Sequence, residues 1–110
     1  EHPNHSLVVE MSKKADVHKN IEEFKDQYNT LVGERGVMLS GGQKQRICIA
    51  RAMIKQPNIL IFDDCLSALD TETEENILRN IDKDIKTTTS IIITHRESSA
   101  KRADQILYLN

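Results

Sequence analysis

The chain has 110 residues, 38% of them hydrophobic and 29% charged, with a net charge of -2. This composition excludes a disordered segment and predicts a small folded domain with one modest core. It also lacks the basic surplus that attracts nucleic acid or anionic lipid, so no nucleic-acid partner is expected. The longest apolar runs, residues 59–62 and 91–93, are far too short to cross a bilayer.

The first third of the chain predicts a helix followed by a loop. Apolar side chains recur near a helical period over residues 7–24, with a break expected at residues 16–19. Residues 25–30 indicate a turn, and residues 33–36 form a loop bracketed by two glycines.

A sharper helix signal begins at Ser40. Ser40 and Gln43 fit a capping box, in which Ser40 is the N-cap and Gln43 is the third helical residue. The helix is expected to run through Ile54 because Pro57 forbids its continuation. Two glycines in its first turn leave backbone amides bare, with Lys44 and Arg46 nearby. An anion site is one interpretation of this turn, and an ordinary helix cap is the other.

The second half of the chain alternates strands and helices. Residues 59–62, 90–94 and 105–109 predict strands. The first is an uninterrupted apolar run, as expected of a strand buried on both faces, and the second is expected to be another buried strand. Residues 71–85 and 97–103 predict the helices between them. This order is typical of an α/β domain with a parallel sheet.

The helix expected over residues 71–85 has signals for its start and for its buried face. Asp70 or Thr71 can cap it, and Thr71 with Glu74 fits a second capping box. Its inward face is expected to consist of Ile77, Leu78, Ile81 and Ile85.

Polar residues follow the first two predicted strands. Asp63 and Asp64 end the first strand, and Thr94 and His95 end the second. Open α/β sheets bind ligands at the carboxyl ends of their strands. Two carboxylates near a histidine suit a magnesium–phosphate site, because carboxylate oxygens bind the hard cation and the imidazole donates to phosphate. Taken singly, each aspartate reads as a cap and the histidine as a structural residue, whereas together they favour a site.

Short motifs in this order resemble those of the ATP-binding-cassette (ABC) family. Residues 39–43, Leu-Ser-Gly-Gly-Gln, match its signature motif, residues 59–63 are similar to Walker B, residues 67–70 resemble the D-loop, and His95 resembles the switch histidine. The resemblance covers roughly residues 16–110.

The family likeness implies a fold and a division of the chain. The fold would be the C-terminal half of an α/β P-loop NTPase (RecA-like) parallel sheet with part of the ABC helical subdomain. Residues 1–57 would belong to the helical subdomain, and residues 58–110 would belong to the RecA-like core.

The resemblance also implies a role for each matching residue. In this family two cassettes pair head to tail around two ATP molecules, so that the signature of one covers the γ-phosphate held by the other. The ATP-contacting residues would be Leu39, Ser40, Gly41, Gly42, Gln43 and, at the dimer interface, Asp70. Asp63 would hold Mg²⁺, and His95 would bond the γ-phosphate.

Asp64 departs from the family pattern, which has a catalytic glutamate that polarises the attacking water. Aspartate is one methylene shorter, so its reach is reduced and hydrolysis is expected to slow. Such a site is frequent in one half of heterodimeric exporters, which favours a heterodimer. The alternative is a regulatory cassette that binds ATP and scarcely hydrolyses it.

Residues 30–36, which include Gly33 and Gly36, resemble the loop that contacts the coupling helices of the membrane domain in exporters. This likeness favours an exporter, at the cytoplasmic face of the cell membrane, over an importer ATPase and over a soluble ABC protein without a transport role. No GxxxxGK[ST] sequence occurs, so the P-loop is expected to precede Glu1 and the isolated chain is expected to be inactive.

The family's sheet also implies unpaired strand edges in this chain. There the P-loop strand lies between the strands that correspond to residues 90–94 and 106–109. We therefore expect the isolated chain to associate through these edges or to rearrange its last strand.

Overall fold

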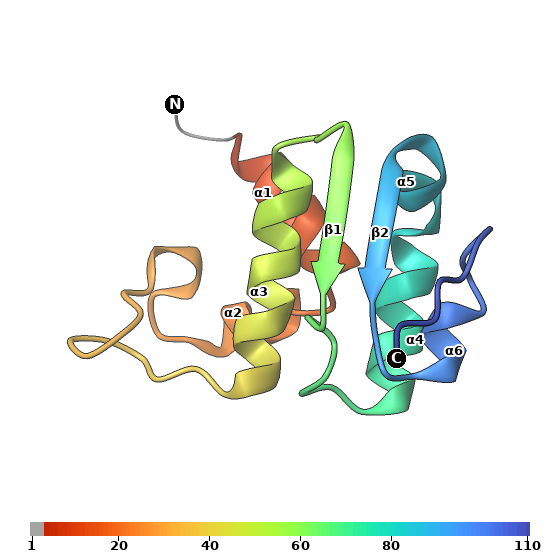
Figure 1. Cartoon of the computed structure of the whole chain (residues 1–110). Coiled ribbons are helices and arrows are strands. Elements are labelled where there is room, and N and C mark those ends of the chain that lie inside the picture. Colours follow the sequence, from red (N-terminus) through yellow and green to blue (C-terminus); the bar gives the residue numbers. More distant parts are fainter. Residues whose placement is uncertain (1–3) are drawn as a thin grey trace.

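A computed structural model describes residues 4–110. Its helices are α1 (His5–Lys14), α2 (His18–Glu23), α3 (Gly41–Ile54), α4 (Thr71–Asn80), α5 (Asp82–Thr87) and α6 (Glu97–Ala100), with a short 3-10 helix, η1 (Gln27–Asn29). The strands are β1 (Ile59–Asp63) and β2 (Thr89–Ile93). Figure 1 shows α3 leading into β1, and α4 and α5 leading into β2.

The two strands form a parallel sheet, in which Ile59 lies opposite Thr89 and Asp63 lies opposite Ile93. Parallel strands need a crossover connection, which α4 and α5 supply. The predicted α/β class with a parallel sheet is therefore confirmed. Both strands end toward the part of the molecule where α3 begins (Figure 1).

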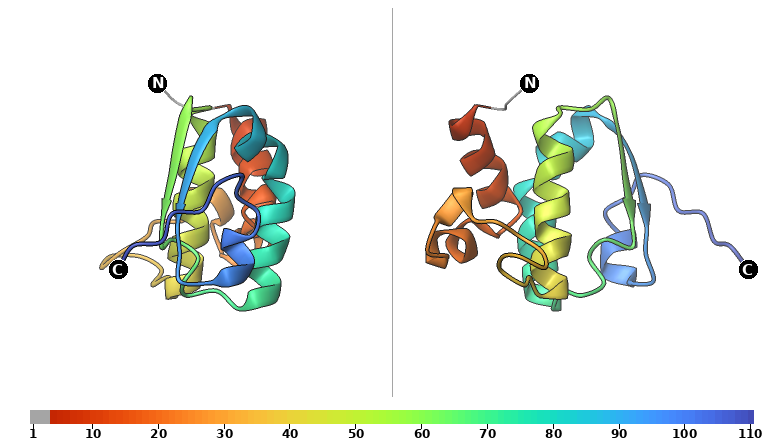
Figure 2. Two further views of the ribbon diagram at one scale, coloured as in Figure 1. Left: turned by 45° about the vertical axis from the view of Figure 1, so that its right-hand side comes forward. Right: turned by 90° about the vertical axis from the view of Figure 1, so that its left-hand side faces the viewer.

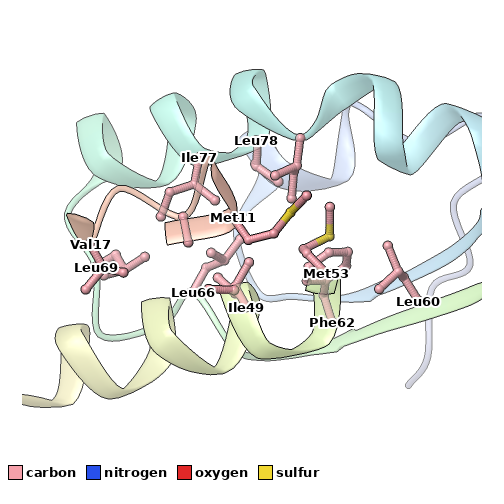
Figure 3. Packing of buried hydrophobic residues seen from close by; sticks show 13 residues of the cluster. Met11, Val17, Ile49, Met53, Leu60, Phe62, Leu66, Leu69, Ile77 and Leu78 are labelled. Atoms are coloured by element: carbon pink, nitrogen blue, oxygen red, sulfur yellow. The ribbon is translucent and has the colours of Figure 1, made fainter. Parts of the chain in front are cut away.

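The helices lie on one face of the sheet. Figure 2 shows the sheet edge-on, with α3 and α4 beside it and α1 beyond them. The side chains between these layers form one cluster, part of which is shown in Figure 3. Its buried members are Met11, Ala15, Val17, Ile49, Ala50, Met53, Leu60, Phe62, Leu66, Leu69, Ile77, Leu78 and Ile81. The division of the chain at residue 57 stays a prediction.

The expectation that both strands are buried on both faces is wrong. Ile59 and Ile61 are 61% and 63% exposed, whereas the alternate residues of β1 belong to the core. Successive side chains of a strand point to opposite faces, and the helices cover only one of them. Ile91 and Ile93 of β2 continue the open face, which is therefore apolar.

The expected third strand is also absent. Residues 105–109 are extended but unpaired, and Leu107, Tyr108 and Leu109 are more than 80% exposed. A strand needs a neighbour for its backbone groups, and β2 pairs only with β1 within residues 4–110. The preceding helix is shorter than expected, because α6 ends at Ala100.

The expected break in the first helical region is confirmed. Asp16 adopts φ 58°, a left-handed conformation that ends one helix before His18 begins the next. The expected turn over residues 25–30 contains η1.

The start of α4 differs from one of the two sequence interpretations. Asp70 is the N-cap, and its carboxylate accepts a hydrogen bond from the Thr73 amide at 2.7 Å. The capping box of Thr71 with Glu74 is wrong, because Glu74 is buried and turns toward Arg96 and Ser99. The predicted inward face is confirmed, since Ile77, Leu78 and Ile81 are core residues and Ile85 packs against them.

Candidate functional site: the signature helix and the strand ends

The start of α3 is built by the capping box that the sequence predicts. The Ser40 hydroxyl accepts a hydrogen bond from the Gln43 amide at 3.2 Å, and the Ser40 amide donates to the Gln43 side-chain oxygen at 3.0 Å. These bonds fix the first turn, where backbone amides and the helix dipole together favour an anion.

Two glycines let this first turn pack against residues 67–70, the segment that resembles a D-loop and is called the D-loop below. A methyl group at Gly41 would lie 3.6 Å from the Ala68 side chain. At Gly42 it would lie 3.2 Å from a Leu69 methyl carbon and 3.4 Å from the Ala68 carbonyl oxygen. Only glycine permits this approach at Gly42 without a shift of its neighbours.

The helix start and the D-loop line a shared open hollow of about 450 Å³. Its lining residues are Ser40, Gly41, Gly42, Arg46, Ala68, Leu69, Asp70 and Thr73. Arg46 is held by bonds from its guanidinium to the Gly42 carbonyl, at 3.2 Å, and to Asn20, at 2.9 Å. The hollow thus combines the backbone amides of the first helical turn, the guanidinium of Arg46 and the carboxylate of Asp70.

Asp70 is the carboxylate of this hollow. The hydrogen bond from the Thr73 backbone amide lowers the pKa of Asp70 below its ordinary 3.8. The Thr73 hydroxyl and the guanidinium groups of Arg46 and Arg96 lower this pKa further. Asp70 is therefore ionised at neutral pH.

A second group of polar residues lies at the carboxyl edge of the sheet. Asp63 ends β1, and Asp64 follows with φ 52°, a left-handed conformation that aspartate tolerates better than most residues. The Asp64 amide donates to the Ile93 carbonyl at 3.0 Å, which extends the β1–β2 ladder by one residue. His95 lies two residues beyond Ile93, so the sheet brings the two aspartates and the histidine to one edge. All three side chains are exposed there.

Residues 4–110 contain no group of three or more His, Cys, Asp or Glu side chains placed to hold a metal ion. Mg²⁺ commonly takes only one or two carboxylates and completes its shell with water and substrate phosphates. Asp63, an exposed carboxylate at a strand end, fits that kind of binding.

Three further residues connect these parts through contacts that the sequence did not predict. Gln45, Glu74 and Arg96 all bond to the D-loop or to each other. The helical period held a signal for Glu74, because it lies three and four residues before the inward-facing Ile77 and Leu78. No local pattern identifies its partner Arg96.

The loop before α3 is a closed, glycine-dependent turn. Gly33 has φ 112°, and a side chain at Gly36 would overlap the Leu31 carbonyl. The turn is closed by a hydrogen bond from the Val37 amide to the Leu31 carbonyl at 2.8 Å. It presents exposed apolar residues, since Leu31 and Val32 are 65% and 54% exposed.

The chain is similar to known proteins. The ABC transporter family model matches residues 1–67. The alpha-hemolysin translocation ATP-binding protein HlyB of Escherichia coli is 52% identical over 102 residues, which are 93% of this chain and 14% of that protein. ABC transporter B family member 1 of Dictyostelium discoideum is 48% identical over 94% of this chain and 11% of its own length. The structure of a bacterial Atm1-family ABC exporter with ATP bound matches 94% of this chain and 18% of its own chain, with a TM-score of 0.86 and 41% identity.

The chain therefore belongs to the ABC transporter family. It spans less than a fifth of the length of these relatives. In the part of the chain that the structure describes, no helix has the length and apolar character needed to cross a bilayer.

Proposed function

We propose that the chain is part of the ATP-binding cassette of an ABC exporter, which couples ATP binding and hydrolysis to transport. The observation that carries this proposal is the hollow in which the first turn of α3 faces Arg46 and Asp70. Bare amides, a helix dipole and a fixed guanidinium are suited to a phosphate group. The similarity to an ABC exporter with ATP bound supports the same conclusion.

The signature residues act on an ATP held by a second cassette. Ser40, Gly41 and Gly42 line the hollow, while Gln43 closes the capping box and Leu39 leads into it. The hollow is open to solvent, so a phosphate brought by a partner surface can enter it. Asp70 lies beside the same phosphate at the interface between the cassettes.

The strand-end residues act on the ATP that the cassette itself holds. Asp63 binds Mg²⁺, which when bound neutralises charge on the phosphates. His95 donates to the γ-phosphate from the end of the neighbouring strand. Asp64 orients the attacking water, and its short side chain makes this site slow. A slow site suits one half of a heterodimer, so we propose a heterodimeric transporter with a faster partner site.

The closed turn of residues 31–37 meets the membrane domain at the cytoplasmic face of the cell membrane. Its exposed Leu31 and Val32, together with Met38 just after the turn, offer apolar side chains for docking of the coupling helices.

The proposed role of the signature is tested by Ser40→Arg in the complete transporter. The bulky cation should block hydrolysis of the partner's ATP while leaving nucleotide bound at this cassette's own site. Vanadate trapping, measured separately at the two sites, reads out this difference. Ser6→Arg, on the exposed side of α1, is the matched control. Equal trapping at both sites in the Ser40→Arg protein would refute the assignment.

The role of Asp64 is tested by two substitutions in the same protein. Asp64→Glu should raise turnover at this site because it restores the longer reach, whereas Asp64→Asn should change total ATPase activity little. A large loss with Asp64→Asn would show that the aspartate is an efficient base and that the site is not slow. The 110-residue chain alone should release no phosphate from ATP, and release that His95→Ala abolishes would contradict this expectation.

A further inference from the structure

A buried carboxylate anchors the segment that follows β2. Glu74 of α4 is 1% exposed and accepts hydrogen bonds from the Ser99 hydroxyl and from the Arg96 guanidinium. A buried charge is tolerated only when it is paired and hydrogen-bonded. Arg96 is therefore held in one place by a partner from a different helix.

The same guanidinium reaches the D-loop. Its Nη2 donates to the Leu69 carbonyl at 2.7 Å and lies 3.4 Å from the Ser67 carbonyl. Arg96 directly follows His95, and its own amide donates to the Thr94 hydroxyl at 3.0 Å. One residue thus joins the backbone of the switch histidine to the backbone of the D-loop.

The signature helix, α3, is hydrogen-bonded to the D-loop through Gln45. The Gln45 side-chain oxygen accepts from the Ala68 amide at 2.8 Å, and its nitrogen donates to the Ser67 hydroxyl at 3.0 Å. Gln45 lies on α3 five residues after Ser40, on a helix whose first turn already packs against the D-loop.

We propose that Arg96 and Gln45 are positioning residues that hold the D-loop between the signature helix and the switch histidine. Their hydrogen bonds reach successive D-loop residues and end one residue before Asp70. A displacement of His95 is transmitted by Arg96 to the Leu69 carbonyl and so to Asp70. Gln45 ties that movement to α3, and hence to Ser40. The inference rests on the proposed function, because it names how the two ATP-facing parts of this cassette are connected.

The chemistry of both side chains suits this role. The planar fork of arginine can bond a carboxylate and a carbonyl at once, which a lysine ammonium cannot reproduce with the same geometry. Arg96→Lys therefore keeps the charge beside Glu74 but loses the hydrogen bond to the Leu69 carbonyl of the D-loop. Gln45→Leu keeps the size of the side chain and removes both of its hydrogen bonds.

The test uses the complete transporter that carries this segment and measures kcat and KM for ATP. Arg96→Lys and Gln45→Leu should each lower kcat by roughly tenfold to a hundredfold, as expected for a misplaced catalytic group, with KM changed less than about threefold. Arg79→Lys, an exposed arginine on the same helix as Glu74, is the matched control and should leave both constants unchanged.

Hydrogen exchange on the same proteins separates this inference from the proposed function. The Ala68 amide should exchange about tenfold faster in Gln45→Leu, which corresponds to one lost hydrogen bond, while the amides of α3 and β1 keep their protection. Unchanged exchange over residues 68–70 in both variants overturns the positioning role even if ATPase activity falls. If the unsubstituted transporter itself shows no ATPase activity, the proposed function is contradicted. Faster exchange over residues 68–70 in the variants would still support the positioning role in that case.

A substitution of Arg96 can leave the buried Glu74 without its charged partner and so unfold the protein. A double variant keeps the inference testable in that case. Glu74→Gln with Arg96→Met removes both charges together, so that no buried charge is left alone. A folded double variant with wild-type kcat overturns the inference, and one with the lowered kcat of Arg96→Lys supports it.

Discussion

Replacement of the two signature glycines by alanine separates local helix stability from packing on the D-loop. Both glycines lie in the first turn of α3, and alanine is favoured over glycine in a helix by up to about 1 kcal/mol. At Gly41 the new methyl group would make ordinary contact with Ala68 at 3.6 Å. We therefore expect Gly41→Ala to raise the free energy of unfolding by up to about 1 kcal/mol.

The same change at Gly42 meets a tighter environment. Its methyl group would lie 3.2 Å from a Leu69 side-chain carbon and 3.4 Å from a backbone oxygen of Ala68. Overpacking of this kind costs about 1–3 kcal/mol, which offsets or exceeds the gain in helix propensity. We expect Gly42→Ala to be less stable than Gly41→Ala by at least about 1 kcal/mol.

Urea denaturation of the three proteins, followed by circular dichroism, measures this difference. When the protein concentration and the slope of the transition are the same in all three, differences between the midpoints report differences in stability. Gly42→Ala with a stability equal to or above that of Gly41→Ala would show that the D-loop does not pack against the helix start. In the complete transporter, Gly42→Asp should abolish ATPase activity, because a side chain at this position would push the phosphate away from the helix amides.

Three further predictions follow from burial and charge. The lowered pKa of Asp70 means that its charged cap stabilises α4 above pH 3.8 and that this contribution is lost as the pH falls through the lowered pKa. The stability difference between the protein and its Asp70→Asn variant should therefore shrink on acidification, and a constant difference would contradict the cap. Burial raises the pKa of Cys65 to about 11, whereas Cys48 is exposed. Iodoacetamide at neutral pH should label Cys48 first, and equal rates for the native chain would be evidence against the burial of Cys65. The isolated chain should self-associate through the open apolar face of its sheet, and Ile61→Lys should weaken this association in sedimentation experiments. A monomer at high concentration would contradict that expectation.

Features that depend on a few neighbouring residues could be predicted from the sequence. The capping box of Ser40 and Gln43 closes within four residues, so its geometry is local. The placing of Asp63 and His95 at one sheet edge also followed from the sequence, because parallel strands end on the same side. The break at Asp16 and the stop before Pro57 are likewise set by backbone conformation.

Features that depend on what lies across the fold were decided only by tertiary structure. Ile59 and Ile61 are as apolar as the buried residues of β1, yet they are exposed because helices cover only one face of the sheet. Glu74 fits a local capping box equally well, but it turns inward because Arg96, 22 residues later, brings a charge to pair with it. Residues 105–109 have the pattern of a strand, but strand formation needs a neighbouring backbone, and their own sequence cannot supply one.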